Sequence, residues 1–159
     1  MAEPKNFRGH DLTGADLTGA DLSAAHLEGA DLRWAYMKQA ILSWADLTAA
    51  QLEGADMKGA RLEAADLRTA NLRFTNMEGA DLTSADLTST DMKGAHMEAA
   101  DLRSANLSWV DLSWVDLSWA NMRWANLTGA DLTGTDMSFA KLDNVKWPEG
   151  WKLVRDEKL

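Results

Sequence analysis

Residues 15–22 read Ala-Asp-Leu-Thr-Gly-Ala-Asp-Leu, and the five-residue unit in this stretch runs through nearly the whole chain. In steps of five from Phe7 to Leu142, every residue is Leu, Met or Phe. Two places earlier, from Ala15 to Ala140, the residue is always Ala, Thr or Val, and Asp or Asn usually lies between the two. A repeat of this regularity decides the architecture before any other feature of the chain.

A period of five suits neither an α-helix nor a straight β-strand. On a helix each repeat advances roughly 140° past a full turn, which spreads the leucines around the cylinder. On a strand an odd period sends successive leucines to opposite faces. A chain that turns a corner of about 90° every five residues keeps every leucine inside, as a square coil of four pentapeptides. The period therefore predicts an all-β solenoid of about seven stacked coils, spaced by the usual strand separation of about 4.8 Å.

Composition sets the domain count and the compartment that we expect. The chain has 159 residues, no cysteine and a formal net charge of -9. This predicts one domain over residues 1–159, with repeats over about 5–145 and a cap over about 146–159, without disulfides or thiolate metal sites. Neither an apolar leader in residues 1–10 nor an apolar run long enough to span a membrane occurs, so we expect a cytoplasmic protein. The acidic balance argues against direct binding to nucleic acid or to anionic lipid.

The sequence offers no catalytic apparatus. Its three histidines are His10, His26 and His96, and the last two replace the Asp of the repeat on different sides of the coil, too far apart for a shared site. Neither a phosphate loop nor a nucleophile elbow nor a metal-ligand spacing occurs. We therefore expect no enzyme activity, no cofactor and no metal. The repeated Asp residues are expected to accept hydrogen bonds from the backbone at each corner, as Asp does in turns.

Aromatic residues stand where the repeat usually has Gly, Ala or Ser, two places after the leucine and facing solvent. Four consecutive pentapeptides carry one tryptophan each, which predicts an aromatic belt around the sixth coil. Two roles stay open: each ring lies flat over a small residue of the adjacent coil, or the rings form a binding surface for protein, sugar or a membrane interface. The candidate interaction surface comprises Trp34, Tyr36, Trp44, Phe74, Trp109, Trp114, Trp119 and Trp124.

Each end of a solenoid exposes an apolar layer that has to be covered. After Leu142 the period breaks, and we expect a corner at Pro148 followed by a short amphipathic helix across the last coil. The cap residues would be Trp147, Trp151, Leu153 and Val154. The N-terminal end has only a thin cover, so the sequence predicts a monomer or an end-to-end dimer.

The run Ala-Asp-Leu-Xaa-Xaa, as in residues 80–84 and 130–134, resembles the pentapeptide-repeat proteins over about residues 5–145. The stretch Lys-Trp-Pro-Glu-Gly-Trp at 146–151 is similar to the ending of many members. The resemblance implies a right-handed quadrilateral β-helix. Members include inhibitors and protectors of bacterial DNA gyrase, thought to act by resembling duplex DNA, which requires a strongly acidic face. Here every face mixes Asp with Arg or Lys, and no loop interrupts the coils.

Three interpretations therefore stay open. The first is a non-enzymatic scaffold or protein-interaction module, with a protein as its partner. The second is a DNA-mimicking effector of DNA gyrase or another type II topoisomerase. The third is an engineered repeat protein with no native function.

Overall fold

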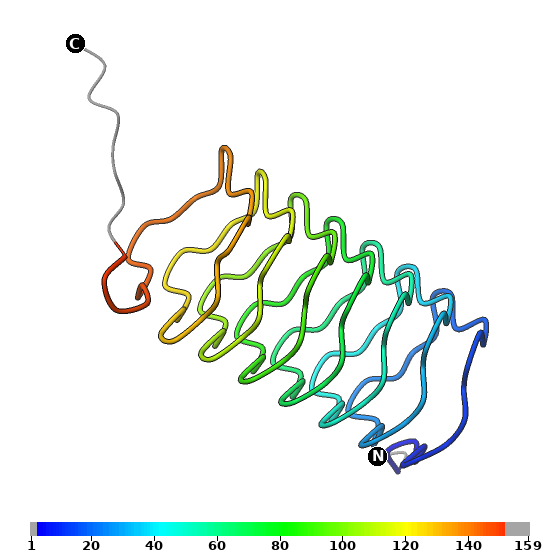
Figure 1. Ribbon diagram of the computed structural model, residues 1–159. Coiled ribbons are helices and arrows are strands. Elements are labelled where there is room, and N and C mark those ends of the chain that lie inside the picture. Colours follow the sequence, from blue (N-terminus) through cyan, green and yellow to red (C-terminus); the bar gives the residue numbers. More distant parts are fainter. Residues whose placement is uncertain (1–2, 152–159) are drawn as a thin grey trace.

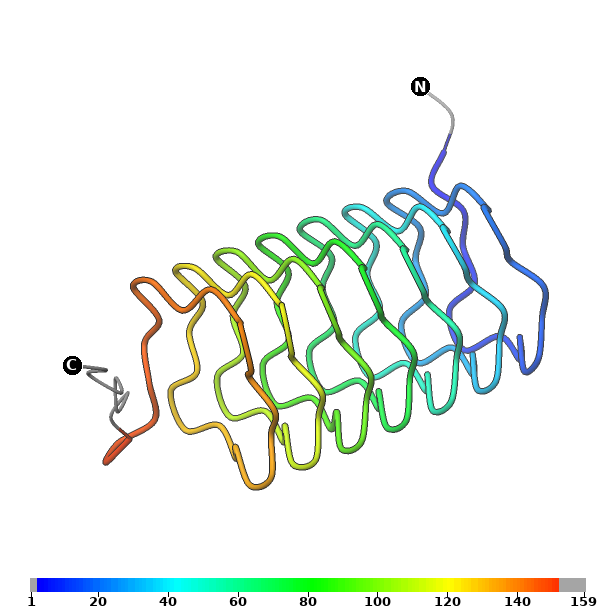
Figure 2. The same cartoon turned by 90° about the horizontal axis from the view of Figure 1, so that it is seen from above.

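The protein folds as a straight rod of stacked four-sided coils, seen in a computed structural model that describes residues 3–151 (Figure 1). The chain winds steadily from one end to the other, so the first and last described residues lie at opposite ends (Figures 1 and 2). All four sides of each coil align with those of the next coil along the rod (Figure 2). The predicted stack of square coils is thereby confirmed.

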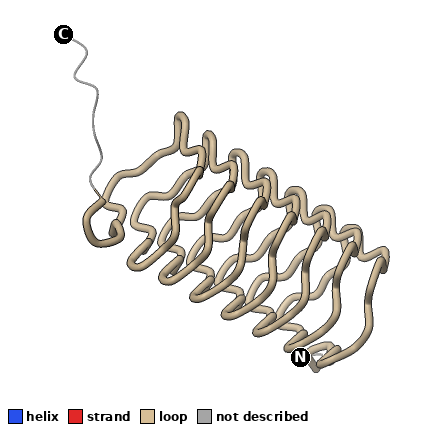
Figure 3. Tube along the Cα trace, viewed as in Figure 1, coloured by secondary structure: helices blue, strands red, loops and turns tan. Residues whose placement is uncertain are grey.

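Backbone pairing between coils consists of parallel bridges that join residues 20 apart, from Asn6↔His26 to Asn126↔Lys146. Each bridge is a single residue wide, so the part of the chain from residue 3 to residue 151 contains neither a helix nor a longer strand (Figure 3). The reason lies in the length of each side. Most of each pentapeptide belongs to the corner, which leaves a single residue to pair with the next coil.

Every corner is a tight turn that begins at the core leucine. In a typical one, Ala85 N donates to the carbonyl of Leu82 at 3.0 Å, and Ser84 adopts a φ of 59°. A positive φ at the third residue of the turn is usually supplied by Gly, yet other residues hold it at most corners here. Before the turn, the Asp81 Oδ1 accepts a hydrogen bond from Thr83 N at 2.9 Å. The predicted role of the repeated Asp is therefore confirmed.

The core is a column of Leu and Met side chains along the rod axis, lined by the small residue that precedes each by two places. Met57, Leu82 and Leu107 are fully buried, as the period predicts. Leu12 and Leu17 pack against the core but are only partly buried, because the first coil has a neighbour on one side alone. Each coil is thus held mainly by the coils beside it.

The C-terminal segment departs from the predicted helical cap. Lys146 still pairs with Asn126, but Pro148 is buried and Trp151 N donates to its carbonyl at 3.1 Å, with Gly150 at a φ of 83°. Residues 148–151 therefore form a tight turn at the expected corner, with Gly150 at the positive φ that such a turn favours. The described residues contain no part of the expected helix, and residues 152–159, over which it would continue, lie outside them.

The rest of the predicted cap is only partly covered by the structure. Trp147 is partly buried against the core cluster, while Trp151 is exposed. Leu153 and Val154 lie outside the described residues.

Candidate interaction surface

The structure places all eight candidate aromatic side chains outside the core, with exposed fractions from 50% for Phe74 to 72% for Trp44. Seven of them occupy the third position of a corner turn, and Tyr36 lies on a flat side in a bridge to Asp16 and Asp56. At the corners their φ values lie near 60°, a conformation that costs an L-residue roughly 1–2 kcal/mol. These corners therefore hold large apolar side chains on a strained backbone.

Several rings lean over the corner of the following coil, where the equivalent residue is glycine. A Cβ atom added to Gly94 would lie 2.8 Å from the Phe74 ring, and one added to Gly134 would lie 2.7 Å from Trp114. Both distances are shorter than real Cβ contacts, so a side chain at either glycine would force the ring above it to move. One face of each ring is used in packing within the rod, while the side chain as a whole stays more than half exposed at Trp114.

Two further rings lean in the same way. A Cβ atom on Gly54 would lie closer still to the Trp34 ring, and one on Gly129 would lie closer still to the Trp109 ring. Trp119 instead stacks on Phe139, with ring centroids 4.5 Å apart and planes 17° from parallel. Coil-to-coil packing and an exposed aromatic surface are thus properties of the same side chains.

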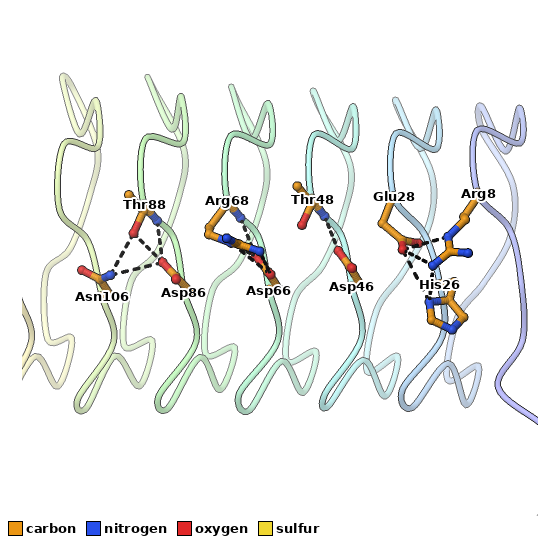
Figure 4. Close-up of polar contacts among 10 residues, drawn as sticks. All are labelled: Arg8, His26, Glu28, Asp46, Thr48, Asp66, Arg68, Asp86, Thr88 and Asn106. Carbon is orange, nitrogen blue, oxygen red and sulfur yellow. Dashed lines mark hydrogen bonds and ion pairs between the residues drawn. The ribbon is translucent and has the colours of Figure 1, made fainter.

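A row of polar contacts runs along one side of the rod for most of its length (Figure 4). Arg8 Nη2 lies 2.6 Å from Glu28 Oε1, with His26 beside them, and this hydrogen bond lowers the pKa of Glu28 to about 2. Further along, Arg68 pairs with Asp66. The histidine that replaces Asp is therefore part of a surface ion-pair cluster.

The ion-pair partners of the arginines do not follow from the 20-residue spacing between coils alone. Arg33 pairs with Asp31, two residues before it, and does not reach Glu53 on the next coil. This short contact holds the pKa of Asp31 at about 2. Lys58 does pair with Glu78 on the next coil, at 2.7 Å. Such exposed pairs are screened by solvent and contribute little to the stability of the fold.

Negative charge without a partner gathers near the C-terminal end. Two adjoining sides of the rod matter here: the Asp11 side, made of residues 11, 13 and their equivalents in each later coil, and the Asp16 side, made of 16, 18 and their equivalents. On the fifth to seventh coils, these sides carry five carboxylates that form no ion pair with any residue between 3 and 151. They are Glu98, Asp111, Asp116, Asp131 and Asp136.

A shallow hollow on the Asp16 side, of about 300 Å³, adjoins this charge. Its lining includes Glu78, His96, Glu98 and Asp116. The corners that bound this side in the sixth coil hold Trp114 and Trp119. The surface can therefore offer carboxylates and indole rings to the same partner.

Sequence reasoning missed one arrangement. Arg73 places its Cζ 5.4 Å from the centre of the Phe74 ring and its Nη1 3.2 Å from Asp91 Oδ2 on the next coil. A cation–π contact and an ion pair thus hold one guanidinium at a corner. The sequence signal for this arrangement is an Arg-Phe pair with an Asp 18 residues after the Arg. It can be recognised only when it is known which pentapeptides face each other in adjacent coils.

No group of three or more His, Asp or Glu side chains among residues 3–151 is arranged to hold a metal ion. The same residues include no helix of the length and apolarity needed to cross a bilayer.

The geometry defines a four-sided β-solenoid built from five-residue repeats, with its chemistry on the outer surface. The family described as pentapeptide repeats (8 copies) matches residues 6–43, 45–83, 80–118 and 111–146. The chain belongs to the pentapeptide-repeat family. Membership implies that the coils wind as a right-handed β-helix.

Solved structures of this family resemble the rod. A trypsin-treated form of QnrB1, a plasmid-mediated fluoroquinolone resistance protein, shares 21% identity over 90% of this chain and 86% of its own, with a TM-score of 0.66. The pentapeptide repeat protein alr5209 from Nostoc PCC 7120 shares 35% identity over 58% of this chain and 78% of its own, with a TM-score of 0.55. A search of curated proteins gave no match.

Proposed function

We propose that this chain is a non-enzymatic protein-interaction module, which presents a partner with the sixth-coil belt of Trp109, Trp114, Trp119 and Trp124. The observation that carries the proposal is the exposure of four tryptophans on consecutive corners whose backbone they strain. Glycine suits such corners better, so the indoles are expected to serve a purpose beyond the fold. Contiguous exposed aromatic surface marks interaction sites in other proteins.

Rigidity supports this proposal. The belt is carried by a coil whose backbone is tied to both neighbours: Trp114 N donates to Thr133 O of the following coil at 2.9 Å, and Ser113 O accepts from Gly94 N of the preceding coil at 3.1 Å. A side chain held on such a scaffold loses little further freedom when a partner binds, which favours affinity. We expect the protein to work in the cytoplasm.

Affinity capture from the lysate of the native host tests the belt. The bait is the full chain, compared with a variant in which all four belt tryptophans are replaced by glycine, the residue that their φ favours. A matched control replaces Trp34 and Trp44 in the same way. We expect a partner that the wild type and the control retain and the belt variant loses. Equal recovery on all three baits would exclude the belt as the contact.

A second candidate is an effector of DNA gyrase or another type II topoisomerase that resembles DNA. The five carboxylates near the C-terminal end that form no ion pair within residues 3–151 favour it, because such an effector has to offer negative charge to a DNA-binding surface. The charge covers only part of the rod, which makes this the weaker candidate. A supercoiling assay with gyrase separates the two: inhibition or protection at micromolar protein supports the second candidate, and an unchanged reaction removes it.

The assembly that we propose is a monomer at low concentration or a dimer joined at one end of the rod. Phe7, Leu12 and Leu17 leave the first coil only partly covered. A two-fold contact between such ends closes at two subunits, whereas head-to-tail stacking would continue into filaments. Light scattering over a range of concentrations tests this: a ring or a growing filament would contradict it.

A further inference from the structure

One corner of the rod already shows how this surface holds a cation. Arg73 lies over the ring of Phe74 and pairs with Asp91, which lies on the next coil. The Phe74 ring packs on Gly94 at the same time, so packing along the rod leaves room for a guanidinium. The corner combines three parts: a cation, an aromatic ring and a carboxylate on the following coil.

Two coils further along, the same corner lacks only the cation. The equivalent residues there are Ser113, Trp114 and Asp131. Trp114 packs on Gly134 as Phe74 packs on Gly94. Ser113 is buried and too short to cover the indole or to reach the carboxylate. The ring and the carboxylate are thus in place without a guanidinium from the chain itself at this position.

The next corner of the same coil repeats the pattern with Ser118, Trp119 and Asp136. Trp119 rests on Phe139 in place of a glycine, and the indole is still more than half exposed. The remaining corners of the sixth coil do not share it, because the place of the carboxylate is taken by Asn126 for Trp109 and by Lys141 for Trp124. Only the two corners beside the Asp16 side combine indole and carboxylate.

Both carboxylates keep one oxygen for another partner. Asp131 Oδ1 accepts from Thr133 N and Oγ1, at 2.9 and 2.6 Å, and Asp136 Oδ1 accepts from Ser138 N at 2.8 Å. Each Oδ2 has no hydrogen bond or ion pair with a residue between 3 and 151. Asp111, Asp116 and Glu98 add negative charge around them.

We propose that the Trp114–Asp131 and Trp119–Asp136 corners each bind an arginine side chain from an extended segment of a partner protein. The proposal rests on the interaction module proposed above and names the chemistry of its partner. Charge complementarity comes from carboxylates that form no ion pair within residues 3–151, and the ring and carboxylate occupy the positions that Phe74 and Asp91 hold at the internal Arg73 corner. Arginine is favoured over lysine because a planar guanidinium stacks on an indole while pairing with a carboxylate.

Peptide titration of the full-length protein, followed by tryptophan fluorescence, tests the proposal. The probe is an unstructured peptide with four arginines separated by Gly and Ser, and the reference is the same peptide with lysines. We expect the arginine peptide to bind roughly five- to tenfold more tightly, in line with cation–π contacts of that size. Equal affinity for both peptides would overturn the proposed corner geometry.

Matched variants separate the corners from general attraction between opposite charges. Asp131→Asn with Asp136→Asn should weaken arginine-peptide binding about tenfold, as expected for removing an ion pair from each site. Asp11→Asn with Asp16→Asn changes the net charge equally in the same two columns at the other end of the rod, and should change affinity less than twofold. An equal loss of affinity in the two double variants would mean that charge alone drives binding.

Ser113→Arg supplies the missing cation from within the chain. It should reproduce the Arg73 arrangement and keep the fold. The new arginine should compete with the peptide for the Trp114–Asp131 corner, so that the affinity for the peptide falls although the Trp119–Asp136 corner is unchanged. Thr13→Arg, at the equivalent position of the first coil, adds the same charge without an aromatic neighbour and is the control. A Ser113→Arg protein that binds no worse than this control would overturn the proposal.

The outcomes also distinguish this inference from the proposed function. Loss of a lysate partner in the belt variant, without any preference for arginine peptides, would retain the interaction module and discard its arginine chemistry. Arginine-selective binding that survives replacement of Trp114 and Trp119 by glycine would contradict both.

Discussion

Gly94→Ala isolates the contact between an aromatic corner and the coil beneath it. At a φ of 68° the new side chain costs roughly 1 kcal/mol in backbone strain alone. Its Cβ would also lie 2.8 Å from two carbons of Phe74, so the ring has to swing away from the fifth coil. Half of the Phe74 surface is buried, and losing that packing costs about 1 kcal/mol more. We expect Gly94→Ala to lower the free energy of unfolding by about 2 kcal/mol.

Gly79→Ala is the matched control, because Gly79 has a φ of 64° and nothing within 4 Å of the added Cβ. It should cost about 1 kcal/mol, the strain alone. In a Phe74→Ala background, Gly94→Ala should cost no more than this control, which gives a coupling of about 1 kcal/mol between the two sites. Urea unfolding followed by circular dichroism and fluorescence, with coincident transitions, measures all four variants. A coupling below roughly 0.3 kcal/mol would show that the ring does not depend on the glycine.

Three further predictions concern the core, the surface charges and the C-terminal end. Leu82→Asp should unfold or split the rod, since an unpaired axial carboxylate costs several kcal/mol, whereas Thr83→Asp should melt close to wild type. Arg8→Gln should raise the pKa of Glu28 from about 2 toward its ordinary 4.5 in an NMR titration. Because the folded-state pKa is lowered, the contribution of this pair to the free energy of unfolding is complete above pH 4.5 and is lost as pH falls toward 2. The Arg8→Gln variant should therefore lack this pH-dependent contribution. Deleting residues 147–159 uncovers the last coil and should produce larger species in light scattering; a monomer as heat-stable as the full chain would contradict the cap.

The period of five was sufficient to predict the coil, the burial of residues such as Met57 and Leu82, and the hydrogen bond from Thr83 to Asp81. These features follow from backbone closure, which leaves one arrangement that buries every leucine. The period did not predict the ion-pair partners of the arginines. Arg33 turns to Asp31 and Arg73 to Asp91, because rotamers of long exposed side chains differ by only a few tenths of a kcal/mol.

The sequence predicted the position of the aromatic side chains at the corners but not their orientation. The register between stacked coils brought most rings over a small residue, with Phe139 below Trp119 as an exception. Whether a ring leans on the next coil or stands free depends on its side-chain torsions. The helix expected after the corner at Pro148 does not begin before Trp151, because Gly150 makes a turn at positive φ. The period predicts the backbone structure within the repeats and says little about the structure of the residues that follow the last repeat.

The bridges that join equivalent residues of adjacent coils give the interior and the exterior of this rod different symmetries. The axial column repeats every pentapeptide, so gain or loss of one unit leaves a leucine at every core site. The outer columns repeat only every four units, and the same change rotates all later surface residues by one side. Loss of one unit between Arg73 and Asp91 would bring His96 opposite Arg73 and Ala99 beneath Phe74. Slippage by a single repeat in the gene can therefore exchange one set of surface neighbours for another while the fold persists, and only slippage by a whole coil preserves both.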